Sequence, residues 1–412
     1  MEDKSVLDAV VVGAGWAGLG VSYALARANM RHRVLERGRI GETWRTQRWD
    51  SFHFNLPNIY SVLPGDSYNG GEPEGFMTHT AFVTLLEDYA RRHQLPVHTG
   101  VAVSKLDSRD GLFRIVTPQQ TWWAKSVVAA SGSLNRPCRP AAASALVSGP
   151  VQIDASDYRN ASVLPAGAIL GCGQCTVGLP NRRRSDHGRQ RDLSRDEPYW
   201  PYAATISRTR HCRVDGEDRN VRRAAQGFRR CIRPRCCSAH AWRVAHISLQ
   251  SLSAQGVVLL GRLVGVEDGR LVFADDLVEN VRFGDQISAQ LKTRIDEFIE
   301  LGGLPAPAVA EDEAETVAPR LPERPILLLD LIERNISAIV WCTGFGGDFN
   351  WIDIPGVLDE RRQPVHEDGI SPIPGVYFAG LDFASTRRSG TVMAIEDEAQ
   401  RFVAHIAARC TI

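Results

Sequence analysis

Neither sign of charge is in excess in this sequence, since 48 lysines and arginines match 48 aspartates and glutamates. The chain therefore has no net positive field that would hold nucleic acid or an anionic membrane. No apolar run approaches the roughly 18 to 20 residues that a membrane-spanning helix needs. The first residues are polar and lack the basic region and cleavage site of a signal peptide. These absences predict a cytoplasmic protein with no nucleic-acid partner and no transmembrane segment.

The sequence also lacks a convincing catalytic triad or pair of carboxylates, so we expect no side-chain nucleophile to be obligatory. What remains is an ordinary globular composition, with 43% apolar and 23% charged residues among 412. This length predicts two or three domains and a core large enough to enclose a cofactor. A small-molecule partner is therefore the reasonable expectation, while nothing in the sequence indicates an oligomeric state.

The first forty residues follow the pattern of a dinucleotide-binding unit. Residues 6–12 form a continuous apolar run typical of a buried strand, and the glycines Gly13, Gly15 and Gly18 follow it directly. Glycines at this spacing let the backbone approach a diphosphate at the amino end of a helix. Residues 32–36 predict a second strand that ends in Glu36, whose carboxylate accepts ribose hydroxyls and repels a 2′-phosphate. The pattern predicts an unphosphorylated adenosine, as in FAD or NAD.

Strands and helices alternate along most of the chain. We expect strands near residues 101–103, 112–116, 126–130, 167–170, 257–260, 270–273, 336–342 and 375–380, and helices over residues 80–92, 283–301 and 391–408. This alternation predicts an α/β fold with parallel sheets, in two nested dinucleotide-binding, Rossmann-like units.

The segment after the ribose acid, Gly41-Glu-Thr-Trp44-Arg-Thr-Gln-Arg48-Trp49-Asp50, resembles the class B flavin-dependent monooxygenases. This group includes flavin-containing monooxygenases, Baeyer–Villiger enzymes and bacterial relatives. Further similar motifs are Ala130-Ser131-Gly132, Cys342-Thr343-Gly344-Phe345 and Gly380-Leu-Asp382 with Arg387-Arg-Ser389-Gly390. The resemblance spans residues 6–170 and 247–408. It implies an FAD domain formed by both chain ends, residues 1–160 and 325–412, and an NAD(P)H domain over residues 161–324.

The resemblance also implies roles for individual residues. Thr43 and Trp44 are expected to line the flavin diphosphate and ring, Asp382 to bind the ribityl chain or phosphate, and Asn55 and Arg387 to contact the reacting part of the flavin. The complete expected cofactor-binding set is Gly13, Gly15, Gly18, Glu36, Thr43, Trp44, Arg48, Ser131, Gly132, Gly344, Gly380 and Asp382.

Structural roles remain open for several of these residues. Trp44 and Trp49 are also compatible with core aromatic residues, and Arg48 with a surface cation. We favour cofactor roles, because these residues closely follow the ribose acid. Asp382 is also suited to capping a helix, and Arg387 to a solvated pair with Arg388.

One departure from the family concerns the linker between the two domains. Asp154 occupies the position at which the family fingerprint has a histidine. A carboxylate cannot provide the donor pattern of an imidazole, and this substitution disfavours a Baeyer–Villiger activity.

The middle of the chain breaks the pattern between about residues 171 and 246. The second glycine-rich turn, at residues 171–178, runs into Pro180 and three arginines instead of a helix, and residues 182–243 hold seventeen arginines and no lysine. A redox dithiol of Cys172 and Cys175 is one explanation, and a zinc site formed by cysteines and histidines is another. We favour a third, a segment read out of frame, because a one-base shift permits an amphipathic helix over residues 176–190. We therefore predict no metal site and a disrupted NADPH domain.

The resemblance implies an FAD-dependent enzyme that consumes NADPH and transfers one oxygen atom from O2 to a small organic substrate through a peroxyflavin. One alternative is an FAD-binding protein without turnover, because its NADPH domain is damaged. A further alternative is a pyridine-nucleotide disulfide reductase that uses Cys172 and Cys175.

Overall fold

The computed structural model describes residues 6–146, 149–173, 202–205, 249–254, 256–303, 317–386 and 388–410. These residues form two compact units. Unit 1 contains both chain ends, up to Pro137 and from Phe345 onward, and unit 2 begins at Cys138 and ends at Gly344.

A five-stranded parallel sheet forms the centre of unit 1. Its order is β18 (Val376–Phe378), β7 (Val127–Ala129), β1 (Ala9–Val12), β2 (His32–Leu35) and β3 (Val97–His98). The central strand β1 is buried along its whole length, as its apolar sequence predicts. Parallel strands end at the same edge, so the loops after β1, β2, β7 and β18 come together there.

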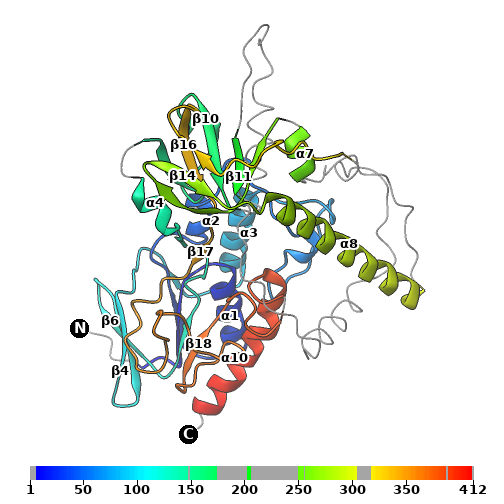
Figure 1. Cartoon of the computed structure of the whole chain (residues 1–412). Helices are drawn as coiled ribbons and strands as arrows, with labels where there is room; N and C mark the ends of the chain where they lie inside the picture. Colours follow the sequence, from blue (N-terminus) through cyan, green and yellow to red (C-terminus); the bar gives the residue numbers. More distant parts are fainter. Residues whose placement is uncertain are drawn as a thin grey trace. The chain divides into compact units, whose positions relative to one another are not determined.

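The helices of unit 1 flank this sheet. They are α1 (Trp16–Arg27), α2 (Glu42–Thr46), α3 (His79–Arg92) and α10 (Ile395–Cys410), with the short helices η1 (Asn58–Tyr60) and η3 (Val392–Ala394). The helices α1 and α10 lie side by side although they come from opposite chain ends (Figure 1). Gly20 permits this approach, because a Cβ atom there would lie 2.7 Å from Cγ1 of Ile395. The predicted closing helix is confirmed, and it begins at Ile395 after the η3 turn.

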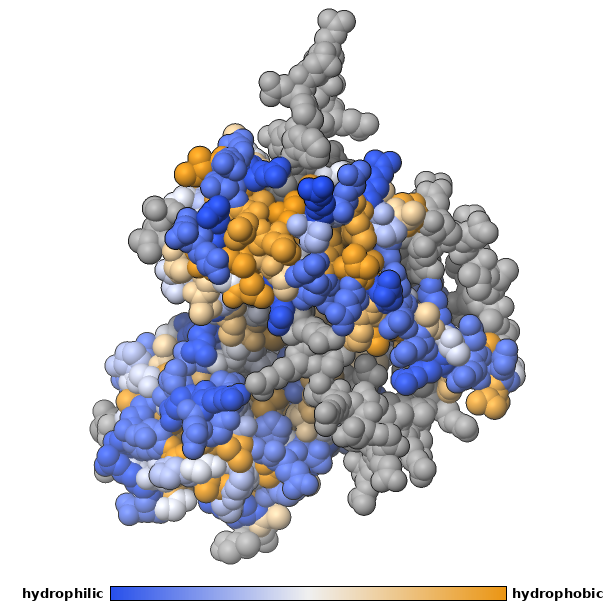
Figure 2. All heavy atoms as spheres, viewed as in Figure 1, coloured by the Kyte–Doolittle hydropathy of each residue, from blue (hydrophilic) through white to orange (hydrophobic). Residues whose placement is uncertain are grey.

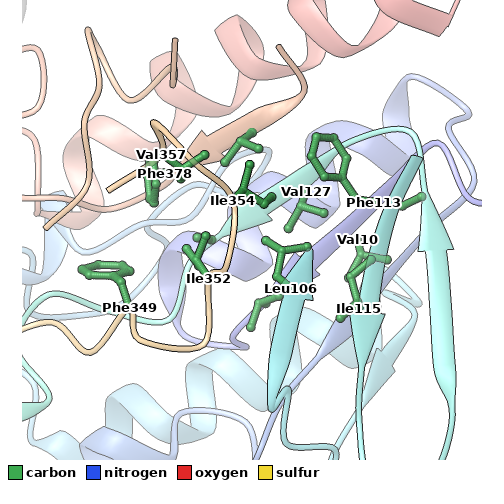
Figure 3. Close-up of a cluster of buried hydrophobic side chains, with 14 of the residues drawn as sticks. Val10, Leu106, Phe113, Ile115, Val127, Phe349, Ile352, Ile354, Val357 and Phe378 are labelled. Atoms are coloured by element: carbon green, nitrogen blue, oxygen red, sulfur yellow. The ribbon is translucent and has the colours of Figure 1, made fainter. Parts of the chain in front are cut away.

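A second, antiparallel sheet of unit 1 contains β4 (Lys105–Arg109), β5 (Leu112–Val116) and β6 (Thr121–Ala124). Its apolar side chains share one core with the parallel sheet, and Figure 3 shows Val10, Leu106, Phe113, Ile352 and Phe378 in this cluster. The short strands β8 (Arg136–Pro137) and β17 (Phe345–Gly346) pair where the chain leaves and re-enters unit 1. The predicted strand at residues 101–103 is wrong: these residues have no strand structure.

Unit 2 also has a five-stranded parallel sheet, in the order β12 (Val258–Leu260), β11 (Tyr202–Thr205), β10 (Ala168–Cys172), β16 (Ile336–Trp341) and β9 (Val151–Asp154). The chain divides into these units between residues 137 and 138 and between residues 344 and 345. The domain borders at residues 160 and 325 remain a prediction from the sequence. Strand pairing places residues 151–154 and 336–341 in unit 2, because β16 pairs with β10 and β9 pairs with β16.

The remaining elements of unit 2 are the antiparallel strands β13 (Leu263–Glu267), β14 (Arg270–Phe273) and β15 (Leu328–Leu329), the helices α4 (Ala141–Ala145), α7 (Leu249–Ala254) and α8 (Leu277–Gly302), and the short helix η2 (Ala161–Val163). Figure 2 shows apolar side chains on the viewed surface around β14, where Val264 and Leu328 are about half exposed. Most of the irregular segment proposed for residues 171–246 lies outside the described residues.

Candidate functional site

A cavity of about 450 Å³ lies in unit 1, at the carboxyl ends of its parallel strands. The chain segments that follow β1, β2, β7 and β18 all contribute to its wall, together with α2 and two loops. The lining residues are Val12, Gly13, Gly15, Trp16, Ala17, Leu35, Glu36, Arg37, Gly41, Glu42, Thr43, Trp44, Arg48, Val101, Ala102, Val103, Ala130, Ser131, Gly132, Ser133, Leu134, Asn135, Asp348, Trp351, Ala379, Gly380, Asp382 and Gly390. Open parallel sheets bind ligands at this edge.

The three predicted glycines have different functions in the turn before α1. A Cβ atom on Gly13 would lie 2.4 Å from the Ala130 carbonyl oxygen, and one on Gly18 would lie 1.9 Å from the Gly13 carbonyl oxygen. Gly13 also has a φ of +109°, which side chains disfavour. Gly15 differs, because a Cβ atom there would meet nothing within 4 Å. Gly13 and Gly18 are thus needed for packing, and Gly15 leaves open space at the cavity wall.

The amino end of α1 faces this space with backbone donors. The first-turn N–H groups of a helix have no acceptor within the helix, and they carry partial positive charge. No side chain caps α1, and its N-cap residue is Gly15. The arrangement suits a diphosphate or another anion.

The Glu36 carboxylate lies at the end of β2, and only 8% of the residue is exposed. Its Oε2 accepts a 2.7 Å hydrogen bond from the Ala14 N–H, and its Oε1 accepts a 2.9 Å bond from the Gly38 N–H. These two bonds fix the acid between the glycine turn and the loop after β2. Each carboxylate oxygen retains acceptor capacity that sugar hydroxyls can use.

Aromatic side chains form the wall beside α2. The Trp44 ring stacks on Phe54 with 4.8 Å between ring centroids, and Phe82 meets it edge-on at 5.1 Å. The Arg48 guanidinium lies 4.3 Å from the Trp44 ring centroid, a cation–π geometry. Trp44 therefore both packs against the core and lines the cavity. Trp49 is 4% exposed and is not a lining residue, so it has the structural role.

Two buried polar atoms in the segment after β7 have no hydrogen-bond partner, the Ser131 Oγ and the Asn135 Oδ1. The amide orientation of Asn135 is fixed, because its Nδ2 donates a 2.7 Å hydrogen bond to the Ser131 carbonyl oxygen. Buried polar atoms are normally satisfied, and an exception beside a cavity points to a missing polar ligand or water.

The carboxy-terminal wall consists of Ala379, Gly380, Asp382 and Gly390. Asp382 lines this cavity. Its partial burial raises the pKa of its carboxyl, because the surrounding protein removes water from the charged form. A Cβ atom on Gly390 would lie 2.0 Å from the Asp382 Oδ1. Glycine at position 390 therefore lets the Asp382 side chain occupy its place at the wall.

The structure brings together ten of the fourteen predicted site residues, namely Gly13, Gly15, Glu36, Thr43, Trp44, Arg48, Ser131, Gly132, Gly380 and Asp382. Gly18 packs behind the turn. Asn55 is exposed on a loop and is not a lining residue, and Gly344 lies in unit 2, where its carbonyl oxygen accepts a hydrogen bond from the Cys138 N–H. Arg387 lies outside the described residues.

The sequence does not predict several of the lining residues, chiefly residues 101–103, Trp16, Asp348 and Trp351. Residues 101–103 form a short apolar run, which indicates a strand and not a cavity wall. The Val101 N–H donates a 2.8 Å bond to the Glu36 carbonyl oxygen, and the chain then follows the cavity wall. The pair Asp348 and Trp351 comes shortly after the predicted return motif at residues 342–345, the one signal that pointed to them.

Neither a metal centre nor a membrane helix is found in the described part of the chain. Among those residues no group of three or more histidine, cysteine, aspartate or glutamate side chains is placed to hold a metal ion. None of the described helices is long and apolar enough to cross a membrane.

Residues 10–164 match the model of the family Pyridine nucleotide-disulphide oxidoreductase. An uncharacterized oxidoreductase, CzcO-like, from Geobacillus kaustophilus is 25% identical, and the alignment covers 97% of this chain and 98% of that protein. A flavin-containing monooxygenase from Stenotrophomonas maltophilia has a similar fold, with a TM-score of 0.59, 16% identity and coverage of 98% and 99% of the two chains. The structure of OTEMO in complex with FAD and NADP is similar with a TM-score of 0.57 and 13% identity, over 98% of this chain and 86% of that one.

These comparisons confirm the expected resemblance to flavin-dependent oxidoreductases and monooxygenases, and with it the enzyme class. They also confirm the α/β fold with parallel dinucleotide-binding sheets. The two molecules bound in the OTEMO complex, FAD and NADP, are the cofactors that the sequence leads us to expect.

Proposed function

We propose that this chain holds FAD in the cavity of unit 1 and uses NADPH and O2 to oxygenate a small organic substrate. The observation that carries the proposal is the composition of a single cavity. Its wall contains the open space at Gly15 beside the amino end of α1, the Glu36 carboxylate and the Gly380–Asp382 segment. The cavity lies at the carboxyl ends of four parallel strands. A cytoplasmic location remains a prediction from the sequence.

The residues of the cavity fit a flavin dinucleotide. Glu36 would accept the adenosine ribose hydroxyls, and the free N–H groups of α1 would hold the diphosphate. The rest of the molecule would then lie against Trp44, Ser131, Asn135 and Asp382. The partnerless Ser131 Oγ and Asn135 Oδ1 support this assignment, because a polar ligand would satisfy buried atoms that the protein leaves unpaired.

Bound FAD would accept a hydride from NADPH and pass electrons to O2, so that one oxygen atom enters the substrate and the other leaves as water. The protein contributes positioning and exclusion of water. Trp44 forms part of the wall, and the rings of Phe54 and Phe82 pack against it. The Arg48 guanidinium over the Trp44 ring adds positive charge next to this wall.

The NADPH site belongs to unit 2 in this proposal. Strand β10 ends at Cys172 and leads into Gly173, whose φ of +115° and close approach to the Cys342 carbonyl oxygen require glycine. The residues that follow are outside the described part of the chain. The interpretation of a frame change there remains a prediction, which the intact mass and the nucleotide sequence across codons 165 to 250 test directly.

The disulfide-reductase alternative is disfavoured by the position of one of its two thiols. Cys172 is 1% exposed inside the sheet of unit 2, whereas a thiol that attacks a disulfide needs access to it. Replacement of Cys172 by serine is therefore expected to leave NADPH oxidation unchanged.

The test is a sequence of optical measurements on the purified full-length chain. The protein is expected to carry or take up one FAD with a flavin absorbance band, and NADPH is expected to bleach that band without oxygen. Under air, consumption of NADPH and O2 should rise with an accepted substrate and yield a product with one added oxygen atom. A colourless protein after incubation with FAD would overturn the proposal. A coloured protein that NADPH cannot bleach would overturn the oxygenase and leave an FAD-binding protein.

A further inference from the structure

Glu398 is a buried carboxylate that none of the proposed binding roles uses. It lies near the amino end of α10, and only 2% of the residue is exposed. Two other acids of the same helix, Glu396 and Asp397, are exposed. Burying an acid costs free energy unless the group makes specific interactions, so this position calls for an explanation.

The Glu398 carboxylate contacts the turn that forms the carboxy-terminal cavity wall. Its Oε2 accepts a 3.2 Å hydrogen bond from the N–H of Gly380, a lining residue. Gly380 packs closely against α1 and requires glycine, because its φ is +73° and a Cβ atom there would lie 2.7 Å from the Ala17 Cβ. Glu398 thus holds this backbone against the first turn of α1.

Ser389, which is 4% exposed and precedes Gly390, lies close enough to the same carboxylate to oppose the rise in the pKa of Glu398 that burial causes. The Ser389 Oγ accepts hydrogen bonds from the N–H groups of Ser385, at 3.1 Å, and Thr386, at 3.2 Å. A hydroxyl that accepts two backbone donors still has one proton to donate. The Ser385 Oγ, 3.2 Å away, can accept that proton, and the Oε1 of the nearby Glu398 has no hydrogen-bond partner in the structure. The Glu398 carboxylate thus lies beside both the turn at residues 385–389 and the Gly380 turn.

We propose that Glu398 is a positioning residue of the FAD site, which fixes the Gly380–Asp382 and Ser389–Gly390 segments at the cavity wall. This inference rests on the proposed function, since it concerns the same cavity. Glu398 is not a lining residue and acts only through the two segments that it joins. Its removal is expected to weaken contacts to the part of FAD beyond the diphosphate and to spare the adenosine end, which Glu36 serves.

The test compares the dissociation constants of FAD and ADP for the wild type, Glu398→Leu and Glu398→Gln. Leucine removes every acceptor, so we expect FAD affinity to fall about tenfold, as for loss of a buried hydrogen bond. Glutamine keeps an oxygen that accepts from the Gly380 N–H, and we expect it to restore most of the affinity. ADP affinity should stay within about twofold in both variants, because ADP lacks the part of FAD that the Gly380 and Ser389 segments contact. Glu396→Gln is the matched control on the exposed face.

The outcomes are distinguishable. No FAD binding by the wild type defeats the proposed function itself. Normal FAD affinity in Glu398→Leu, with a wild-type protein that binds FAD, overturns the positioning role. Equal losses of FAD and ADP affinity in both variants also overturn it, because a general folding defect would act on both ligands. Should Glu398→Leu fail to fold, Ser389→Ala decides: an unchanged ratio of FAD to ADP affinity contradicts the proposal, and a selective loss for FAD supports it.

Discussion

The Oε2 atom of Glu36 accepts a 2.7 Å hydrogen bond from the backbone N–H of Ala14. This bond joins the acid at the end of β2 to the glycine turn between β1 and α1. It sets the distance between the expected ribose acceptor and the expected diphosphate site, so both depend on one carboxylate.

Replacement of Glu36 by alanine should weaken FAD binding by about 10- to 100-fold, because hydrogen bonds to a charged group contribute about 1.5–3 kcal/mol. Titration of the apoprotein with FAD, followed by flavin fluorescence, measures this change. Glu360→Gln, on an exposed loop, is the control and should bind as the wild type. Equal affinities of the alanine variant and the control would remove Glu36 from the site.

Substitutions at two glycines of the turn should have different effects, one on the stability of the protein and the other on FAD binding. Gly18→Ala places a Cβ atom 1.9 Å from the Gly13 carbonyl oxygen, and we expect overpacking to lower the free energy of unfolding by about 1–3 kcal/mol. Gly15→Ala meets no protein atom within 4 Å and has a φ of −80°, so its unfolding free energy should stay close to the wild-type value. Its methyl group would instead enter the space expected for the diphosphate.

Urea unfolding of the apoproteins and FAD titration measure the two effects. Gly15→Ala should lose FAD affinity with an unchanged urea midpoint, and Gly18→Ala should shift the midpoint to lower urea. A Gly15→Ala protein that binds FAD normally would show that the diphosphate does not lie at this turn.

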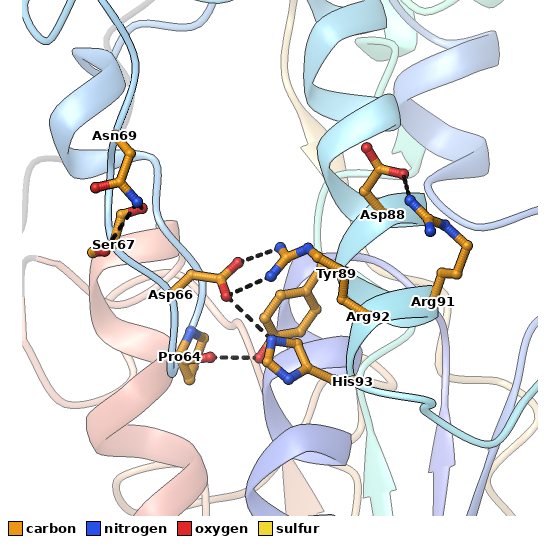
Figure 4. Close-up of polar contacts among 9 residues, drawn as sticks. All are labelled: Pro64, Asp66, Ser67, Asn69, Asp88, Tyr89, Arg91, Arg92 and His93. Atoms are coloured by element: carbon orange, nitrogen blue, oxygen red, sulfur yellow. Dashed lines mark hydrogen bonds and ion pairs between the residues drawn. The ribbon is translucent and has the colours of Figure 1, made fainter.

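The loop after η1 is held to α3 by an ion-pair cluster (Figure 4). The Asp66 carboxylate binds Arg92 through two hydrogen bonds of 2.9 and 2.6 Å, and His93 at 3.1 Å. The Arg92 guanidinium holds the pKa of the Asp66 carboxyl below its usual value. Because the folded pKa is depressed, the stabilisation is fully present above the unfolded pKa of about 3.9, and it is lost as the pH falls through the folded pKa.

Asp66→Asn should therefore lower the free energy of unfolding by about 1 kcal/mol at pH 7, and the difference from the wild type should shrink below about pH 4. Urea unfolding at several pH values gives this difference. Asp88→Asn is the control, since Asp88 pairs with Arg91 on the exposed side of α3. A difference that stays constant down to pH 3 would contradict the ion-pair explanation.

A second pH effect should come from His32, which is 4% exposed on β2. Its Nε2 lies 2.8 Å from the Ser22 Oγ and its Nδ1 2.9 Å from the Met30 carbonyl oxygen. Burial lowers the pKa of His32, so the unfolded chain takes up a proton below about pH 6.5 while the folded chain stays neutral. The free energy of unfolding therefore has its full value above about pH 6.5. It decreases as the pH falls from the unfolded pKa of His32 towards its lower folded pKa.

Thermal unfolding of the apoprotein between pH 8 and 5 measures this loss. His32→Asn should unfold at a lower temperature at pH 8 and show a flatter pH dependence than the wild type. His405→Asn, at an exposed position of α10, should leave the slope unchanged. A wild-type slope in His32→Asn would assign the pH effect to other groups.

Features that depend on neighbouring residues could be predicted from the amino-acid sequence. The glycine turn and Glu36 were predictable because a strand, a glycine turn, a helix and an acid within about thirty residues have one common geometry. The distant segments at Ser131, Gly132, Gly380 and Asp382 were found only through resemblance, since no local pattern shows that they approach the turn.

The remaining features depend on the assembled fold. Residues 101–103 and Trp351 line the cavity because the parallel sheet and the β4–β6 sheet bring their loops to one edge, which short-range periodicity does not encode. The fold also places β16 in unit 2 through its pairing with β10, and β9 through its pairing with β16. It gives Gly15 and Gly18 different roles, because a Cβ atom would meet open space at Gly15 and the Gly13 carbonyl oxygen at Gly18. Strand order and close packing join residues far apart in the chain, so these features arise only when the whole sheet is assembled.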